Sequence, residues 1–145
     1  MKQLTLLLFA VLISTIGCKA PKELEVETIE AVAKGVIVAD WSTYGGSDAI
    51  GINNVTVTGN KMSISVKYNG GCQKHVFQLI GHKMISKSLP PQRSIKLYHD
   101  DNNDDCRELI EEILIFDISE FAIGDGEVSL HLESYDEPIS YFPIK

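Results

Sequence analysis

The chain has 145 residues and a formal net charge of −7, from 13 Lys and Arg residues against 20 Asp and Glu residues. This acidic balance argues against nucleic acid as a partner, because binding to a phosphate backbone requires a basic surface. It also disfavours adsorption to anionic lipid headgroups, so attachment to a membrane must depend on another feature of the chain. The length is sufficient for one domain with a hydrophobic core.

The chain begins with an apolar run from Leu4 to Ile16 that follows Lys2 and precedes Gly17-Cys18. The run is shorter than the about 20 apolar residues that cross a bilayer, and its basic start and small final residue are typical of a secretory signal peptide. Gly17-Cys18 resembles the lipobox of bacterial lipoproteins, in which the leader is cleaved and the cysteine is acylated. The resemblance implies lipidation of Cys18, although Thr15 occupies a position where the lipobox usually has leucine.

The lipobox implies a chain of three parts: a signal peptide over residues 1–17, an acylated N-terminus and tether over residues 18–33, and a single β-rich domain over residues 34–145. Several acyl chains hold a protein firmly to a bilayer, because each buried methylene group contributes about 0.8 kcal/mol. Lys19 follows the cysteine instead of the aspartate that retains such lipoproteins at the inner membrane. We therefore expect a lipid-anchored protein of the cell envelope, at the outer membrane.

From residue 34 onwards, short alternating runs are separated by Gly, Asn, Asp and Pro. Residues 52–58 and 61–68, joined by Gly59-Asn60, predict a β-hairpin whose second arm places every other residue on one apolar face. Further strands are predicted at residues 35–39, 75–80, 93–99, 127–132 and 139–142. The pattern predicts a mostly β fold, which is an antiparallel β-sandwich or a small barrel with at most one short helix.

Residues 108–119 have an ambiguous pattern. The first residues of this segment suit a helical turn, whereas Leu114, Phe116 and Ile118 alternate as they would in a strand. The one short helix of the fold is therefore expected around residues 107–113.

Two cysteines, Cys72 and Cys106, remain once Cys18 is assigned to lipid. An even number of cysteines outside the cytoplasm favours a disulfide, and a bridge closing about 35 residues stabilises a fold by roughly 3–4 kcal/mol in the chain-entropy model. Two alternatives stay open, namely a pair of unpaired buried thiols and a tetrahedral zinc or copper site. The ligands of that metal site would be Cys72, His75, His99 and Cys106, a spacing that matches no standard zinc motif.

An acidic loop provides a second candidate site. Asp100, Asn102 and Asp104 alternate along it, and Glu111 stands at the twelfth position counted from Asp100. This spacing of oxygen donors resembles the calcium loop of EF-hands, although Asp105 occupies the position of its usual glycine and a strand, not a helix, precedes it. A calcium-binding turn and a solvated hairpin loop are both consistent with the pattern.

No sequence motif indicates catalysis. Trp41 and Tyr44, beside Gly45-Gly46, can stack on a sugar or cover the edge of a core. The sequence has no nucleophile elbow, no zinc-protease motif, no phosphate loop and no dinucleotide fingerprint. We therefore expect a protein that is not an enzyme and has no cofactor apart from calcium or zinc at the two candidate sites.

Three patterns in the middle of the chain resemble one family. These are GGCxxHxFxL at residues 70–79, PPQ at residues 90–92 and HDxNxDxC at residues 99–106. Together they look like an uncharacterised group of small bacterial lipoproteins, over residues 52–120. The resemblance implies an envelope protein and indicates no activity. We expect a non-catalytic binding or structural role, with the chain held to the membrane by its lipid and an unidentified protein or glycan partner. The alternative is a periplasmic or surface metal-binding protein.

Overall fold

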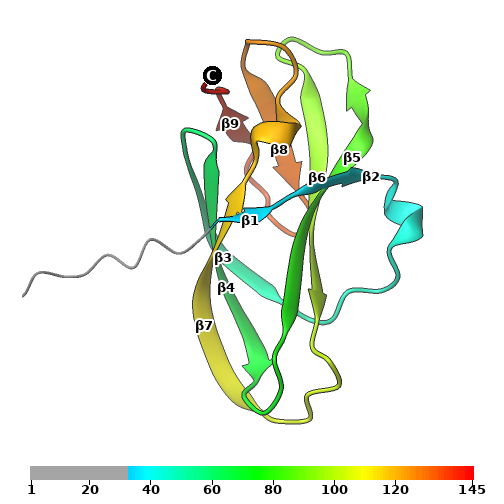
Figure 1. Ribbon diagram of the computed structural model, residues 1–145, viewed down its shortest axis with the longest axis vertical. Helices are drawn as coiled ribbons and strands as arrows, with labels where there is room; N and C mark the ends of the chain where they lie inside the picture. Colours follow the sequence, from blue (N-terminus) through cyan, green and yellow to red (C-terminus); the bar gives the residue numbers. More distant parts are fainter. Residues whose placement is uncertain (1–32) are drawn as a thin grey trace, which may run out of the picture.

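The computed structural model describes residues 33–145, which form a β-sandwich of two sheets (Figure 1). The first sheet contains, in spatial order, β1 (Lys34–Gly35), β7 (Glu108–Asp117), β4 (Lys61–Gly70) and β3 (Gly51–Thr58). The second contains β2 (Ile37–Ala39), β5 (Val76–Ser86), β6 (Gln92–Asp100), β8 (Val128–Leu132) and β9 (Ile139–Tyr141). Two single 3-10 turns, η1 (Trp41–Thr43) and η2 (Ser119–Phe121), complete the described elements.

The predicted mostly β sandwich is therefore confirmed, and the domain is not a closed barrel. The predicted leader, the lipidated Cys18 and all but the last residue of the tether lie outside the described residues. Within residues 33–145, no helix has both the length and the apolar character needed to cross a membrane.

The sheets are mixed and not wholly antiparallel. β3 and β4 form the predicted hairpin, in which Thr58 lies opposite Lys61. In contrast, β1 pairs in parallel with β7, β2 with β5, and β6 with β8. These parallel pairs arise because the chain crosses between the two sheets, and such crossings depend on contacts between residues distant in sequence.

The predicted short helix at residues 107–113 is wrong. This segment belongs to β7, which pairs with β4 along its full length, from Glu108 opposite Gly70 to Asp117 opposite Lys61. Its glutamates and leucines suit a helix when considered alone, but pairing with the long β4 strand satisfies the backbone and overrides this local preference.

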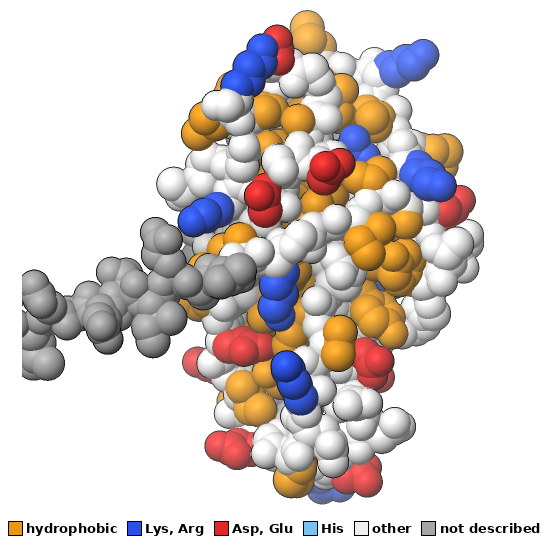
Figure 2. All heavy atoms as spheres, in the orientation of Figure 1, with side chains coloured by type: hydrophobic (Ala, Val, Ile, Leu, Met, Phe, Trp, Pro, Cys, Tyr) orange, Lys and Arg blue, Asp and Glu red, His pale blue; other side chains and the backbone are white. Residues whose placement is uncertain are grey.

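The core lies between the sheets and follows the alternation of the strands. Met62, Ile64, Val66 and Tyr68 of β4 are buried on one face, as predicted. They pack against inward-facing residues of the second sheet, among them Leu79 of β5. On the described part of the face shown in Figure 2, basic side chains are scattered among acidic and hydrophobic ones.

Candidate functional site

One end of the sandwich is closed by a disulfide between Cys72 and Cys106, whose Cα atoms are 5.8 Å apart. The bridge joins the loop between β4 and β5 to the loop between β6 and β7, at the bottom of Figure 1. We call this region the disulfide end. The predicted pairing is thus present, and it removes both thiolates from the proposed zinc or copper ligand set.

The two histidines of that ligand set meet beneath the disulfide. His75 Nδ1 lies 2.8 Å from His99 Nε2, and His75 Nε2 lies 3.2 Å from Asp104 Oδ2. Both imidazoles are buried, with only 9% and 1% of the residue exposed. His99 lies within β6, and His75 immediately precedes β5 instead of opening it; their partner is a carboxylate that the sequence had placed in the acidic loop.

Backbone N–H groups hold Asp104 in this inward position. Its Oδ2 accepts hydrogen bonds from the N–H groups of Cys72 and Gln73, and its Oδ1 accepts one from Cys106. Burial opposes ionisation of this carboxyl group, but the three backbone donors outweigh it and keep the pKa of Asp104 well below its usual value. The ionised Asp104 therefore connects both half-cystines to His75.

Aromatic rings surround the imidazoles. The Phe77 ring stacks on the ring of His99 with a centroid distance of 4.8 Å, and the Tyr68 ring lies 4.7 Å from that of His75. The Tyr68 hydroxyl donates to Glu112, and burial together with this carboxylate raises the pKa of Tyr68 to about 12. Burial, followed by the proximity of His75, lowers the pKa of His99, which favours its neutral form.

The backbone is also adapted to this packing. A β-carbon added at Gly70 would lie only 2.5 Å from His75 Nε2, so glycine is required for the close approach of the imidazole. In the described residues, His99 Nδ1 has no hydrogen-bond partner, whereas His75 and Asp104 are fully engaged. The cluster is therefore closed to solvent and directs no nucleophile or base outwards, which suits a structural role.

The predicted calcium ligands are not brought together. Asp104 turns inwards, and Asp100 Oδ1 accepts the N–H of Asn102 within its own loop. Glu111 lies within β7 opposite Lys67, outside the groups of closely spaced potential ligands in the described residues. The EF-hand-like spacing therefore does not bring Glu111 back to the loop, because a strand follows the loop where the calcium motif has a helix that returns its glutamate.

A different set of carboxylates converges beside this loop. Oxygen atoms of Asp48, Asp100 and Asp101 lie within 4.8 Å of one another, and Asp48 Oδ2 accepts the N–H of Asp101 at 2.8 Å. The sequence analysis missed this group because Asp48 precedes β3, about fifty residues earlier in the chain. We call these three residues the acidic cluster.

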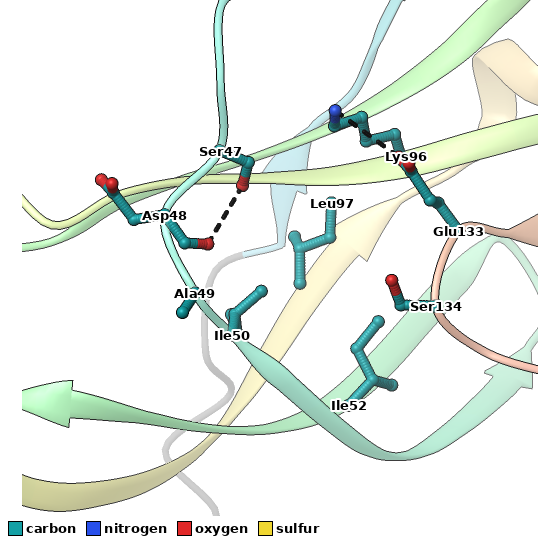
Figure 3. Close-up of a pocket in the computed structure, with 9 residues that line it drawn as sticks. All are labelled: Ser47, Asp48, Ala49, Ile50, Ile52, Lys96, Leu97, Glu133 and Ser134. Atoms are coloured by element: carbon teal, nitrogen blue, oxygen red, sulfur yellow. Dashed lines mark hydrogen bonds and ion pairs between the residues drawn. The ribbon is translucent and has the colours of Figure 1, made fainter.

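A pocket of about 290 Å³ opens next to Asp48 (Figure 3). Ile50, Ile52 and Leu97 form its apolar part, and Lys96 and Glu133 pair at 3.5 Å on its rim. The remaining lining residues are Ser47, Asp48, Ala49 and Ser134.

The two aromatic residues of the glycine-bearing loop are packed on the second sheet. Trp41 contacts His82 edge to face, with the ring centroids 5.2 Å apart, and the Tyr44 ring lies 6.0 Å from that of Tyr98. These contacts support the interpretation in which the aromatic residues cover the edge of the sheet.

The fold resembles solved structures of two Bacteroides proteins. A NigD-like immunity protein from Bacteroides caccae superposes with a TM-score of 0.56 at 16% identity, covering 77% of this chain and 59% of the other. A Bacteroides vulgatus protein of unknown function, described as DUF1344, superposes with a TM-score of 0.54 at 14% identity, covering 76% of this chain and 55% of the other. This chain thus spans less than two thirds of either structure, and identities this low establish similarity of fold alone.

Among curated protein sequences, none matches this chain. The sequence model of the NigD-like C-terminal beta sandwich domain, however, matches residues 37–140, which include every strand from β2 to β8. The matched range covers well over half of the sequence. The chain therefore belongs to the family of NigD-like C-terminal beta sandwich domains.

Proposed function

We propose that this chain is a lipid-anchored binding protein of the bacterial cell envelope, with no catalytic activity. The observation that carries the proposal is the disulfide end, where Cys72 and Cys106 are bridged and His75, His99 and Asp104 bond to one another. The side chains best suited to catalysis are thereby used to hold the fold together.

The disulfide also supports the proposed compartment. Structural disulfides persist in oxidising environments outside the cytoplasm, and Gly17-Cys18 at the end of an apolar run provides both export and a site for lipid. Acylation at Cys18 would place the sandwich at the membrane surface, at the outer membrane, with residues 19–33 as the tether.

A binding role is supported by the description of a similar structure. The Bacteroides caccae protein is described as a NigD-like immunity protein. By analogy, we propose that the sandwich acts by occupying a partner protein. The Cys/His metal site is disfavoured, since the disulfide takes two of its four ligands and the imidazoles bond to each other and to Asp104.

The lipid anchor is tested by growing cells that express the full chain with labelled palmitate. The wild-type chain should incorporate label and sediment with membranes, and Cys18→Ala should do neither because the acylated sulfur is gone. The matched control is the double variant Cys72→Ala/Cys106→Ala, which removes the other two cysteines and should still be labelled. An unlabelled wild-type chain, or a labelled Cys18→Ala chain, would contradict the anchor.

A further inference from the structure

The two lateral sides of the sandwich are closed to different degrees. On one side, the short strands β1 and β2 pair with the last two residues of β7 and with residues 80–82 of β5. The rest of the β7 edge is unpaired but carries Glu108, Glu111 and Glu112, the kind of charged residues that protect an edge strand. On the other side, the edges are β3 and β9. β9 has only three residues, whereas β3 has eight and pairs with β4 alone. Within the described residues, no strand pairs with the outer edge of β3, although β9 of the other sheet lies close to part of it.

β3 also lacks the residues that usually protect a free edge. Natural sheets protect edge strands with charged side chains, prolines or a very short strand. β3 reads GINNVTVT over Gly51–Thr58, with no charge and no proline. Its one protecting feature is a shift in register between Ile52 and Asn54, as in a β-bulge, which leaves residues 54–58 in regular register with β4. A free edge of this length is a template for another extended chain.

The pocket of Figure 3 lies beside this edge. It is lined by Ile50 just before β3, Ile52 within β3, Leu97 of β6 and Ser134 in the turn after β8. The pocket therefore opens between the two sheets on the side of the free strand. Because side chains alternate along a strand, a peptide strand paired with β3 would point every second side chain towards the space between the sheets, and the one nearest Ile52 would reach the apolar part of this pocket.

The charge around the pocket favours a basic segment. Asp48 lines the pocket and belongs to the acidic cluster with Asp100 and Asp101. None of these three carboxylates forms an ion pair within residues 33–145, whereas Lys96 on the rim is already paired with Glu133. A lysine or arginine brought to this end of β3 would supply the missing positive charge.

From the free edge, the pocket and the charge we infer that β3 binds an extended segment of a partner protein by strand addition. The segment would place an apolar side chain in the pocket and a basic side chain beside the acidic cluster. Main-chain hydrogen bonds would contribute affinity, and these two side chains would contribute specificity. The inference rests on the proposed binding role, but it is independent of the lipid anchor.

The test uses the purified full-length chain in detergent and a library of random peptides with the eight-residue length of β3. The peptides that bind should combine alternating apolar residues with a terminal Lys or Arg. Synthetic versions of the best peptide are then methylated on alternate backbone nitrogens. Methylation of the set facing β3 should weaken binding roughly tenfold to a hundredfold, while methylation of the other set should leave it unchanged.

Protein variants locate the peptide. Asp48→Asn keeps the oxygen that accepts the Asp101 N–H but removes a charge, so it should weaken binding of the basic peptide several-fold. Ile52→Ala should weaken binding of peptides with a large apolar residue at the matching position. The control Asp125→Asn removes an exposed carboxylate in the turn before β8 and should have no effect.

Three outcomes would overturn the inference: a library without binders, equal tolerance of both methylation patterns, or binding unaffected by Asp48→Asn and Ile52→Ala. Crosslinking of β3 to β3 in a dimer of the chain would also overturn it, because the free edge would then serve self-association. If the chain took up no palmitate in cells but still bound the peptides, strand addition would stand while the anchor failed, so the two proposals fail separately.

Discussion

The two ends of the sandwich are stabilised by different means. At the disulfide end, a covalent bridge and a polar network around Asp104 connect two loops. At the opposite end, Phe116, Phe121 and Tyr141 are completely buried. Phe121 of η2 lies so close to β5 that a β-carbon at Gly81 would be 2.6 Å from its ring.

The opposite end also buries a charge, but with different support. The Arg93 guanidinium lies 5.9 Å from the Phe121 ring centroid and donates to the carbonyl oxygen of His82. It thus depends on a ring and one backbone acceptor, and burial lowers its pKa. The comparison indicates that an end covered by a large apolar side chain needs no crosslink, whereas an end closed by polar loops is held by a disulfide and by a carboxylate with several donors.

The largest expected effect is at the apolar end. Phe121→Ala removes a buried ring and leaves a cavity, which should reduce the free energy of unfolding by about 3–5 kcal/mol. Chemical denaturation of both chains measures the difference. The matched control is Phe142→Ala, since Phe142 is 63% exposed and its loss should have little effect. Equal effects of the two substitutions would show that η2 does not cover the core as described.

The next effect is at the disulfide end. Cys72→Ala/Cys106→Ala opens a bridge between residues 34 apart, and we expect a loss of roughly 3–4 kcal/mol in unfolding free energy from the chain-entropy model. Reduction of the wild-type chain should have a similar effect, and Cys18→Ala should have none. If the double variant were as stable as the wild type, the polar network alone would be sufficient to hold this end.

The smallest effect is a dependence of stability on pH. The pKa of His99 is lowered from 6.5 in the folded state, so below pH 6.5 the unfolded chain binds more protons and stability falls as pH decreases towards the folded pKa. Asp104, with a pKa lowered from 3.8, adds a second loss that begins below about pH 4 and continues as the folded carboxylate is protonated.

Thermal denaturation between about pH 8 and pH 3 measures both losses. The decline in Tm below pH 6.5 should be weaker in His99→Gln, which has no imidazole to titrate. His131→Gln alters an exposed histidine of β8 and should retain the wild-type profile. An unchanged profile in His99→Gln would assign the dependence to other groups.

Local sequence patterns predicted the strands and turns that depend mainly on neighbouring residues. The alternation in β4 identified its buried face, and Gly59-Asn60 identified the turn that joins it to β3. The even number of cysteines that remain beside Cys18 favoured a disulfide, and the structure contains this bridge between Cys72 and Cys106. By contrast, the segment that became β7 was ambiguous, because its strand pairing is provided by β4, about fifty residues away.

The candidate site shows the same division. The sequence identified His75 and His99 as side chains on apolar faces, but it placed Asp104 among calcium ligands. Only the folded chain shows that backbone N–H groups at residues 72, 73 and 106 turn this carboxylate inwards. The acidic cluster likewise depends on the approach of Asp48 to the end of β6.

The sequence by itself therefore determined that this is a mostly β domain with an apolar face on each long strand and two cysteines suited to pairing. These features follow from side-chain alternation and turn chemistry, which act over a few residues. Tertiary structure alone decided the parallel pairings, the inward turn of Asp104 and the free edge of β3. These three features depend on which backbone N–H and C=O groups, distant in sequence, form hydrogen bonds in the folded chain. Local periodicity carries no information about such distant partners.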